Sequence, residues 1–149
     1  MWTLRSDDRL AEWKLFRKNI GNLSFDDAVS KTVHLWSYAP FVAHYLDHCD
    51  TSVWPTPWEL VANNTYDDMA KALGMIYTLF LSAHGSHHSF ALINVKASST
   101  LEHYSLVSID NGKFILNYSF DEVARKETLS SDIEIIQTYS DLDLQLSKY

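Results

Sequence analysis

Cysteine, proline and glycine are scarce in this chain of 149 residues, which has 1, 3 and 4 of them respectively. The single cysteine, Cys49, excludes a disulfide bond within the chain and suits a reducing compartment. Basic residues are also few: 12 Lys and Arg stand against 19 Asp and Glu, and the formal net charge is −7 at pH 7. Because a surface of this sign repels phosphate backbones, we expect no nucleic-acid partner.

Long hydrophobic runs are absent as well. The longest one, around residues 75–83, is too short and too interrupted to span a bilayer. The N-terminal segment MWTLRSDDRL carries charges where a signal peptide needs an apolar stretch. We therefore expect no membrane partner and a cytoplasmic location. The compact, acidic chain also fits a phage-encoded component that is assembled into a phage particle. The length fits one domain, residues 1–149.

The stretch from Trp54 to Val95 contains the strongest helix signal. Thr65 stands where an N-cap residue belongs, with Asp68 three residues later. Apolar residues then recur at spacings of three and four, which predicts a core helix that ends near Ala83. Gly74 interrupts this helix at a cost of about 1 kcal/mol, and such a glycine often permits close packing of another element.

The remaining elements follow from caps, turns and periodicity. We expect helices over residues 6–19, from the Ser24 cap to before Pro40, over 40–48 and over 120–127. The two prolines of residues 54–58 predict a rigid loop, which acts either as an aromatic recognition surface or as a hydrophobic plug. Strands are expected over His87–Val95, His103–Asp110, Lys113–Ser119 and Ile133–Tyr139, and the last ten residues form an edge strand or are partly disordered.

Asn111-Gly112 favours a type I′ turn, so the second and third strands should form an antiparallel hairpin. The predicted fold class is α+β. N-terminal helices and a central helix (residues 1–83) pack on a mostly antiparallel sheet of about four strands (residues 87–149).

The order of these features resembles the core of transglutaminase-like and papain-like proteins. In that family a cysteine opens the central helix, a histidine begins the next strand, and an aspartate or asparagine lies on the strand after it. The helix N-terminus lowers the thiol pKa, the histidine takes the proton and the carboxylate orients the imidazole. In this chain the resemblance covers residues 54–118 and places the histidine at His88 and the third member at Asp110. It implies a groove between helix and sheet.

The chain departs from the family at the nucleophile, because no cysteine occurs between Thr65 and Ala70. Tyr66 or Asp67 occupies the expected position, and neither replaces a thiolate in acyl transfer. We therefore predict a non-catalytic domain that acts as a protein-binding or assembly component. The predicted binding residues are Tyr66, Asp67, Trp54 and Trp58.

Two alternatives remain open. The first is a cysteine-dependent amide hydrolase or acyltransferase that uses a triad of Cys49, His88 and Asp110. The neighbouring residues Asp47 and Asp50 would raise the pKa of its thiol.

The second alternative is a metal-binding protein. Its candidate ligands are His44 and His48, four residues apart, together with His84 and His87. No further cofactor is expected.

Overall fold

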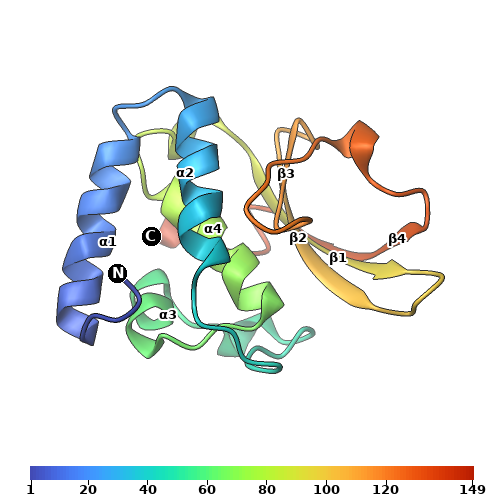
Figure 1. Cartoon of the computed structure of the whole chain (residues 1–149), viewed down its shortest axis with the longest axis horizontal. Coiled ribbons are helices and arrows are strands. Elements are labelled where there is room, and N and C mark those ends of the chain that lie inside the picture. Colours follow the sequence, from blue (N-terminus) through green and yellow to red (C-terminus); the bar gives the residue numbers. More distant parts are fainter.

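The computed structural model describes residues 1–149 as four α-helices followed by four strands (Figure 1). The helices are α1 (Ser6–Ile20), α2 (Phe25–Ser37), α3 (Pro57–Asn63) and α4 (Asp68–Phe80). The strands are β1 (Phe90–Ala97), β2 (His103–Ile109), β3 (Phe114–Leu116) and β4 (Ile133–Tyr139). This is the α+β architecture that the sequence predicts. None of the helices combines the length and the apolar character needed to cross a membrane.

Helix α4 lies at the centre, with α1 and α2 on one side and the sheet on the other (Figure 1). Trp36 of α2 packs directly on Gly74, where an added Cβ would lie 2.4 Å from the Cη2 atom of Trp36. The indole N–H groups of Trp13 and Trp36 both donate to the buried hydroxyl of Thr78, at 3.0 and 2.9 Å. The close packing predicted at Gly74 is therefore confirmed.

The four strands form one antiparallel sheet in the order β3-β2-β1-β4. Asn111 and Gly112 have φ values of +57° and +87°, the positive values that a type I′ turn requires at both central positions. The predicted hairpin between β2 and β3 is thus confirmed. A small second core covers part of the far face of the sheet and is formed by Val95, Leu106 and Ile115.

Residues 40–48 are not helical, contrary to the prediction. Their backbone groups find partners in the segment that leads into α4: Val42 N–H donates to the Tyr66 carbonyl, and the Asp67 carboxylate accepts from the N–H groups of Tyr45 and Leu46. Because these bonds replace helical ones, the segment is extended and irregular.

The prediction of a non-helical loop over residues 54–58 is wrong at its end. Pro57 is the first residue of α3, a position where the missing N–H costs nothing. Thr56 caps the helix and forms a capping box with Glu59. Trp54 and Pro55 remain outside the helix.

Two C-terminal predictions also differ from the structure. Residues 120–127 do not form an α-helix, because the backbone of Ala124 pairs with that of Ile115 on β3. The last ten residues form turns rather than an edge strand, since Leu144 and Leu146 are buried in the main core.

Candidate functional site

The N-terminus of α4 is capped by Asp67 rather than by Thr65. One oxygen of the Asp67 carboxylate accepts from Ala70 N–H at 2.8 Å, and the other accepts from Tyr45 and Leu46 N–H, each at 3.0 Å. The prediction that Thr65 caps the helix is therefore wrong. A carboxylate is favoured at this position because its two oxygens accept from the backbone N–H groups of the helix and of a distant segment at the same time.

Asp68, the next residue, faces the sheet. Its Oδ2 accepts from the backbone N–H of Ser105 at 2.7 Å, and its Oδ1 accepts from the Asn117 amide at 2.9 Å. The same Asn117 amide donates to the Ser105 carbonyl at 2.8 Å, and the Ser105 hydroxyl donates to Asn94 Oδ1 at 2.9 Å. These four side chains, which we call the Asp68 network, join the start of α4 to β1, β2 and the end of β3.

Burial raises the pKa of Asp68, while the hydrogen bonds from Ser105 and Asn117 act in the opposite direction. Asn117 has a φ of +66°, a left-handed conformation that asparagine tolerates better than most residues. This conformation accompanies the bend after β3, and the Asn117 amide is turned toward the helix start.

His88 and Asp110, the second and third members of the predicted triad, do come together. His88 Nδ1 lies 2.7 Å from Asp110 Oδ2, and Ser89 N–H donates to the other carboxylate oxygen at 3.0 Å. The imidazole stacks on Phe25, with ring centroids 3.5 Å apart. Partial burial works to raise the pKa of Asp110, but the bonds from His88 and Ser89 outweigh it and hold that pKa below its usual value.

This pair does not lie at the start of α4, where the family resemblance requires it. The residue of β1 that reaches the Asp68 network is Asn94, six residues after His88, which corresponds to roughly 20 Å of extended chain. The strand residues that meet the helix start are Ser105 and Asn117, on β2 and after β3. The predicted assignment of site residues to strands is therefore wrong by one strand. Strand β1 leads the chain back along α4, so it is β2, and not the start of β1, that meets the N-terminus of α4.

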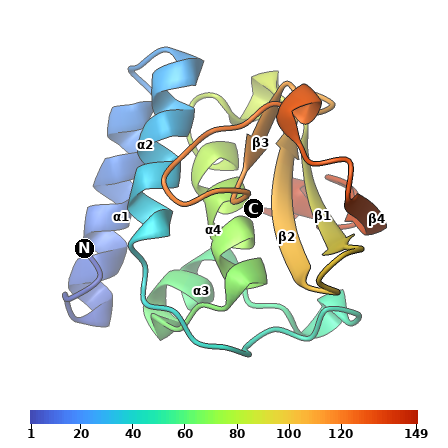
Figure 2. The same ribbon diagram turned by 45° about the vertical axis from the view of Figure 1, so that its right-hand side comes forward.

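Cys49 is not brought to the pair either. Its thiol is exposed, and its backbone N–H donates to Asp47 at 2.8 Å. The neighbouring His48 carbonyl accepts from the hydroxyl of Tyr139, at the end of β4. Figures 1 and 2 show residues 45–55 at the bottom of the molecule and the connection between α4 and β1 at the top.

The predicted metal ligands do not converge. His84 bonds to the Ile20 carbonyl at 3.1 Å, and no group of three or more His, Cys, Asp or Glu side chains is placed to hold a metal ion. His44 and His48 lie in the irregular segment before α3, so they do not share a helix face. The structure thus contradicts the convergence of His44, His48, His84 and His87.

The predicted binding residues are mostly covered. Tyr66 and Asp67 are buried and bonded within the chain, so neither side chain is available to a partner. Trp54 is half-buried against Tyr139, whereas Trp58 remains exposed beside Tyr149. Of the four, Trp58 is the most exposed.

The sequence predictions missed three exposed aromatic residues beside the start of α4. Tyr38, Phe41 and Phe120 are 57, 64 and 66 % exposed, and we call them the aromatic surface. The rings of Tyr38 and Phe120 meet edge to face at 5.2 Å, and Lys71 lies over Phe41. The one signal available in the sequence was the pair Tyr38 and Phe41, which flanks Ala39-Pro40 at the end of a predicted helix. The exposure of Phe120 depends on the fold and could not be predicted.

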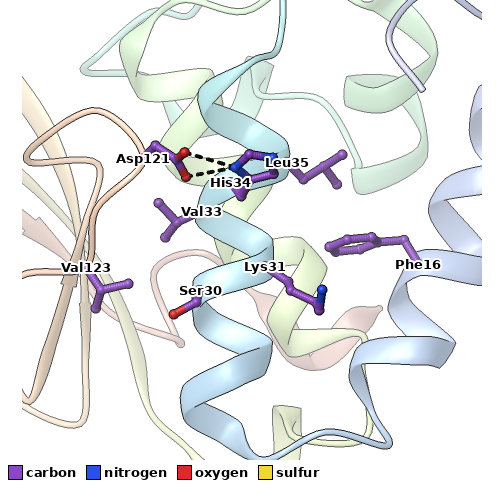
Figure 3. Close-up of a pocket in the computed structure, with 8 residues that line it drawn as sticks. All are labelled: Phe16, Ser30, Lys31, Val33, His34, Leu35, Asp121 and Val123. Carbon is purple, nitrogen blue, oxygen red and sulfur yellow. Dashed lines mark hydrogen bonds and ion pairs between the residues drawn. The ribbon is translucent and has the colours of Figure 1, made fainter.

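A groove of about 620 Å³ lies along α2 (Figure 3), and its lining residues His34 and Asp121 neighbour Tyr38 and Phe120 of the aromatic surface. His34 Nδ1 on α2 lies 2.9 Å from Asp121 Oδ2, and the His34 ring meets Tyr38 at 5.0 Å. Figure 3 shows Phe16 of α1 on one side of α2 and Val123 on the other. The groove therefore extends across the exposed face of α2, from α1 to the segment after β3.

These elements define the fold class of the protein as α+β. A buried central helix, flanked by helices and followed by an antiparallel sheet, is the arrangement that the sequence resemblance to transglutaminase-like and papain-like proteins implies. No protein-family model matches the sequence, and no curated protein matches it.

The solved structures of LapG from Legionella pneumophila have the same fold. The calcium-bound form superposes with a TM-score of 0.70 at 9 % sequence identity, over 92 % of this chain and 77 % of that one. The EGTA-treated form gives a TM-score of 0.71 at 10 % identity, over 91 and 74 % of the two chains.

Proposed function

We propose that this protein is a non-catalytic transglutaminase-like domain that binds another protein. The observation that carries the proposal is the Asp68 network. Where the family resemblance expects a cysteine with a histidine facing it, the start of α4 presents a carboxylate bonded to Ser105 and Asn117.

The chemistry of the network supports a structural role for it. Acyl transfer needs a nucleophile and a base within hydrogen-bond reach of each other. The Ser105 hydroxyl donates to Asn94, an amide that does not act as a base, and the Asp68 oxygens accept from groups of the sheet. Each polar group is thus used to hold the helix against the sheet.

The aromatic surface supports the binding role. Its residues flank the first turn of α4, because Val42 N–H donates to the Tyr66 carbonyl and Lys71 Nζ donates to the Ser37 carbonyl at 3.3 Å. Aromatic side chains are enriched in protein interfaces, where they bury a large area with few rotatable bonds. The surface and the adjoining groove together offer an apolar strip with polar groups at His34 and Asp121.

A partner of this kind would be another component of a larger assembly, of which the phage particle proposed from the sequence is one example. The test is site-specific photo-crosslinking in the source cells, with a photoreactive phenylalanine analogue at Phe41 or at Leu101. Leu101 is the matched control, because it is 63 % exposed and lies in the β1–β2 turn. We expect a specific protein to be crosslinked from position 41 and not from position 101.

The captured protein then allows a quantitative measurement. Replacing Tyr38 and Phe120 by serine should weaken its binding at least about tenfold, as expected for aromatic residues central to an interface, while Leu101→Ser leaves the affinity unchanged. Equal capture from both positions, or equal affinities of the variants, would overturn the proposed surface.

The non-catalytic part of the proposal has its own test, the reactivity of the Cys49 thiol against pH. In the parent and in His88→Ala we expect the same slow alkylation, because the thiol and the imidazole are not hydrogen-bonded partners. Fast reaction below about pH 7 that slows in His88→Ala would indicate a Cys–His pair and would restore the enzyme alternative.

A further inference from the structure

Strand β4 forms one edge of the sheet, and no element of the chain lies beyond it (Figure 2). Two consecutive isoleucines in this strand, Ile135 and Ile136, are 60 and 51 % exposed. They occupy the position where the pairing with β1 shifts register at a β-bulge. The edge strand therefore presents two neighbouring isoleucines to water.

The backbone of β4 has groups available for a further strand. Ser98 N–H donates to the Asp132 carbonyl at 2.9 Å, so the groups of Asp132 face the β1 side. Because successive residues of a strand alternate in direction, the N–H and C=O of Ile135 point to the free edge. Natural edge strands are commonly protected by lysine, proline, a β-bulge or a covering segment. Strand β4 has the bulge but contains neither lysine nor proline.

The acidic residues that flank β4 are bonded within their own chain. The Asp132 carboxylate accepts from the backbone N–H of Ser99, and Asp141 accepts from the N–H of Phe90 at 3.0 Å. Within the strand the one charged residue is Glu134, and its register partner on β1 is Lys96. Strand β4 itself thus has a single charged side chain, Glu134, although the whole chain carries −7.

We propose that β4 pairs antiparallel with β4 of a second copy of this chain around a twofold axis. With the axis anywhere from Ile135 to Gln137, Glu134 of one copy faces a residue between 136 and 140 of the other, and all of these are uncharged. Parallel pairing in register would instead set the two Glu134 side chains side by side, which is unfavourable. The charge pattern therefore selects a symmetric antiparallel pair, which joins two four-stranded sheets into one.

This pairing covers both isoleucines, and it is independent of the aromatic surface. The first experiment measures the molar mass of the parent by sedimentation equilibrium across a concentration series, with Ile135→Lys and Leu15→Lys in parallel. Leu15 is the control because it is half exposed on α1. We expect a monomer–dimer equilibrium in the parent and in Leu15→Lys, and a dissociation constant raised at least about tenfold in Ile135→Lys. Added salt should favour the dimer, because it screens the repulsion between two acidic copies.

A second experiment locates the axis in a Cys49→Ser background. Of Ile135→Cys, Ile136→Cys and Gln137→Cys, the variant on the axis should oxidise to a disulfide-linked dimer, and Leu15→Cys should not. A parent that stays monomeric at every concentration would overturn the proposal. So would a dimer that Ile135→Lys leaves unchanged, or no more crosslinking from any of positions 135, 136 and 137 than from position 15. Circular dichroism of each variant separates loss of pairing from loss of fold.

Discussion

Gly74→Ala tests whether the centre of the fold is packed as tightly as the structure shows. An added Cβ would lie 2.4 to 2.5 Å from three ring atoms of Trp36, which is fully buried and bonded to Thr78. Alanine would gain about 1 kcal/mol of helix propensity. Overpacking costs about 1–3 kcal/mol, and the disturbed indole bond costs about 1 kcal/mol more. We therefore expect a net loss of about 1–3 kcal/mol in the free energy of unfolding.

The assay is urea unfolding followed by tryptophan fluorescence, with stability taken from linear extrapolation at an unchanged m-value. A double-mutant cycle with Trp36→Leu isolates the cause. Once the ring is removed, Gly74→Ala should be neutral or stabilising by up to about 1 kcal/mol. If Gly74→Ala already stabilises the parent protein, the ring is not held against α4 and the packing argument fails.

Three further perturbations address the polar groups around α4 and the sheet. Thr78→Val leaves two buried indole donors without an acceptor and should cost roughly 2–4 kcal/mol in urea unfolding, whereas Thr78→Ser should cost clearly less. Asp67→Ala removes the helix cap and the acceptor of the Tyr45 and Leu46 N–H groups, so it should cost about 2–4 kcal/mol; a loss below about 0.5 kcal/mol, as at an ordinary exposed site, would contradict the cap assignment. The two perturbed carboxylates predict opposite pH slopes. The pKa of Asp110 is lowered in the folded state, so its stabilisation is present above pH 3.8 and is lost as the pH falls through the folded value. The pKa of Asp68 is raised, so the stability it contributes is full below pH 3.8 and declines as the pH rises through the folded value. The measurement is the urea midpoint as a function of pH. The Asp110→Asn variant should lack the slope of Asp110, and the Asp68→Asn variant should lack the slope of Asp68. If both variants have the same pH profile as the parent, both assigned pKa shifts are refuted.

Features that depend on neighbours in the sequence were predictable. Ser24 caps α2 as expected, and Asn111-Gly112 forms the expected turn, because each rests on bonds that span a few residues. The pairing of His88 with Asp110 spans 22 positions, but it follows from the hairpin of β1 and β2. A residue just before one strand of a hairpin lies beside the residue just after the other, so the hairpin alone brings them together.

Features that depend on the choice between partners were not predictable. Thr65 and Asp67 are both acceptable caps, and the choice was made by Tyr45 and Leu46, which bond to the carboxylate from a distant segment. The helix predicted over residues 40–48 failed for the same reason, since its donors are used by those contacts. Local propensity does not register a hydrogen bond to a residue twenty positions away.

The sequence by itself determined the α+β class, the amphipathic helices, the hairpin turn and the absence of a cysteine at the opening of the central helix. Each of these features depends on the composition or on the local periodicity of the sequence. Only the tertiary structure decided which residues face that opening, because the register of the sheet against α4 sets Ser105 and Asn117 there and leaves His88 elsewhere. It also decided that Tyr66 is covered while Phe120 is exposed, since burial depends on what packs over a side chain rather than on the side chain itself.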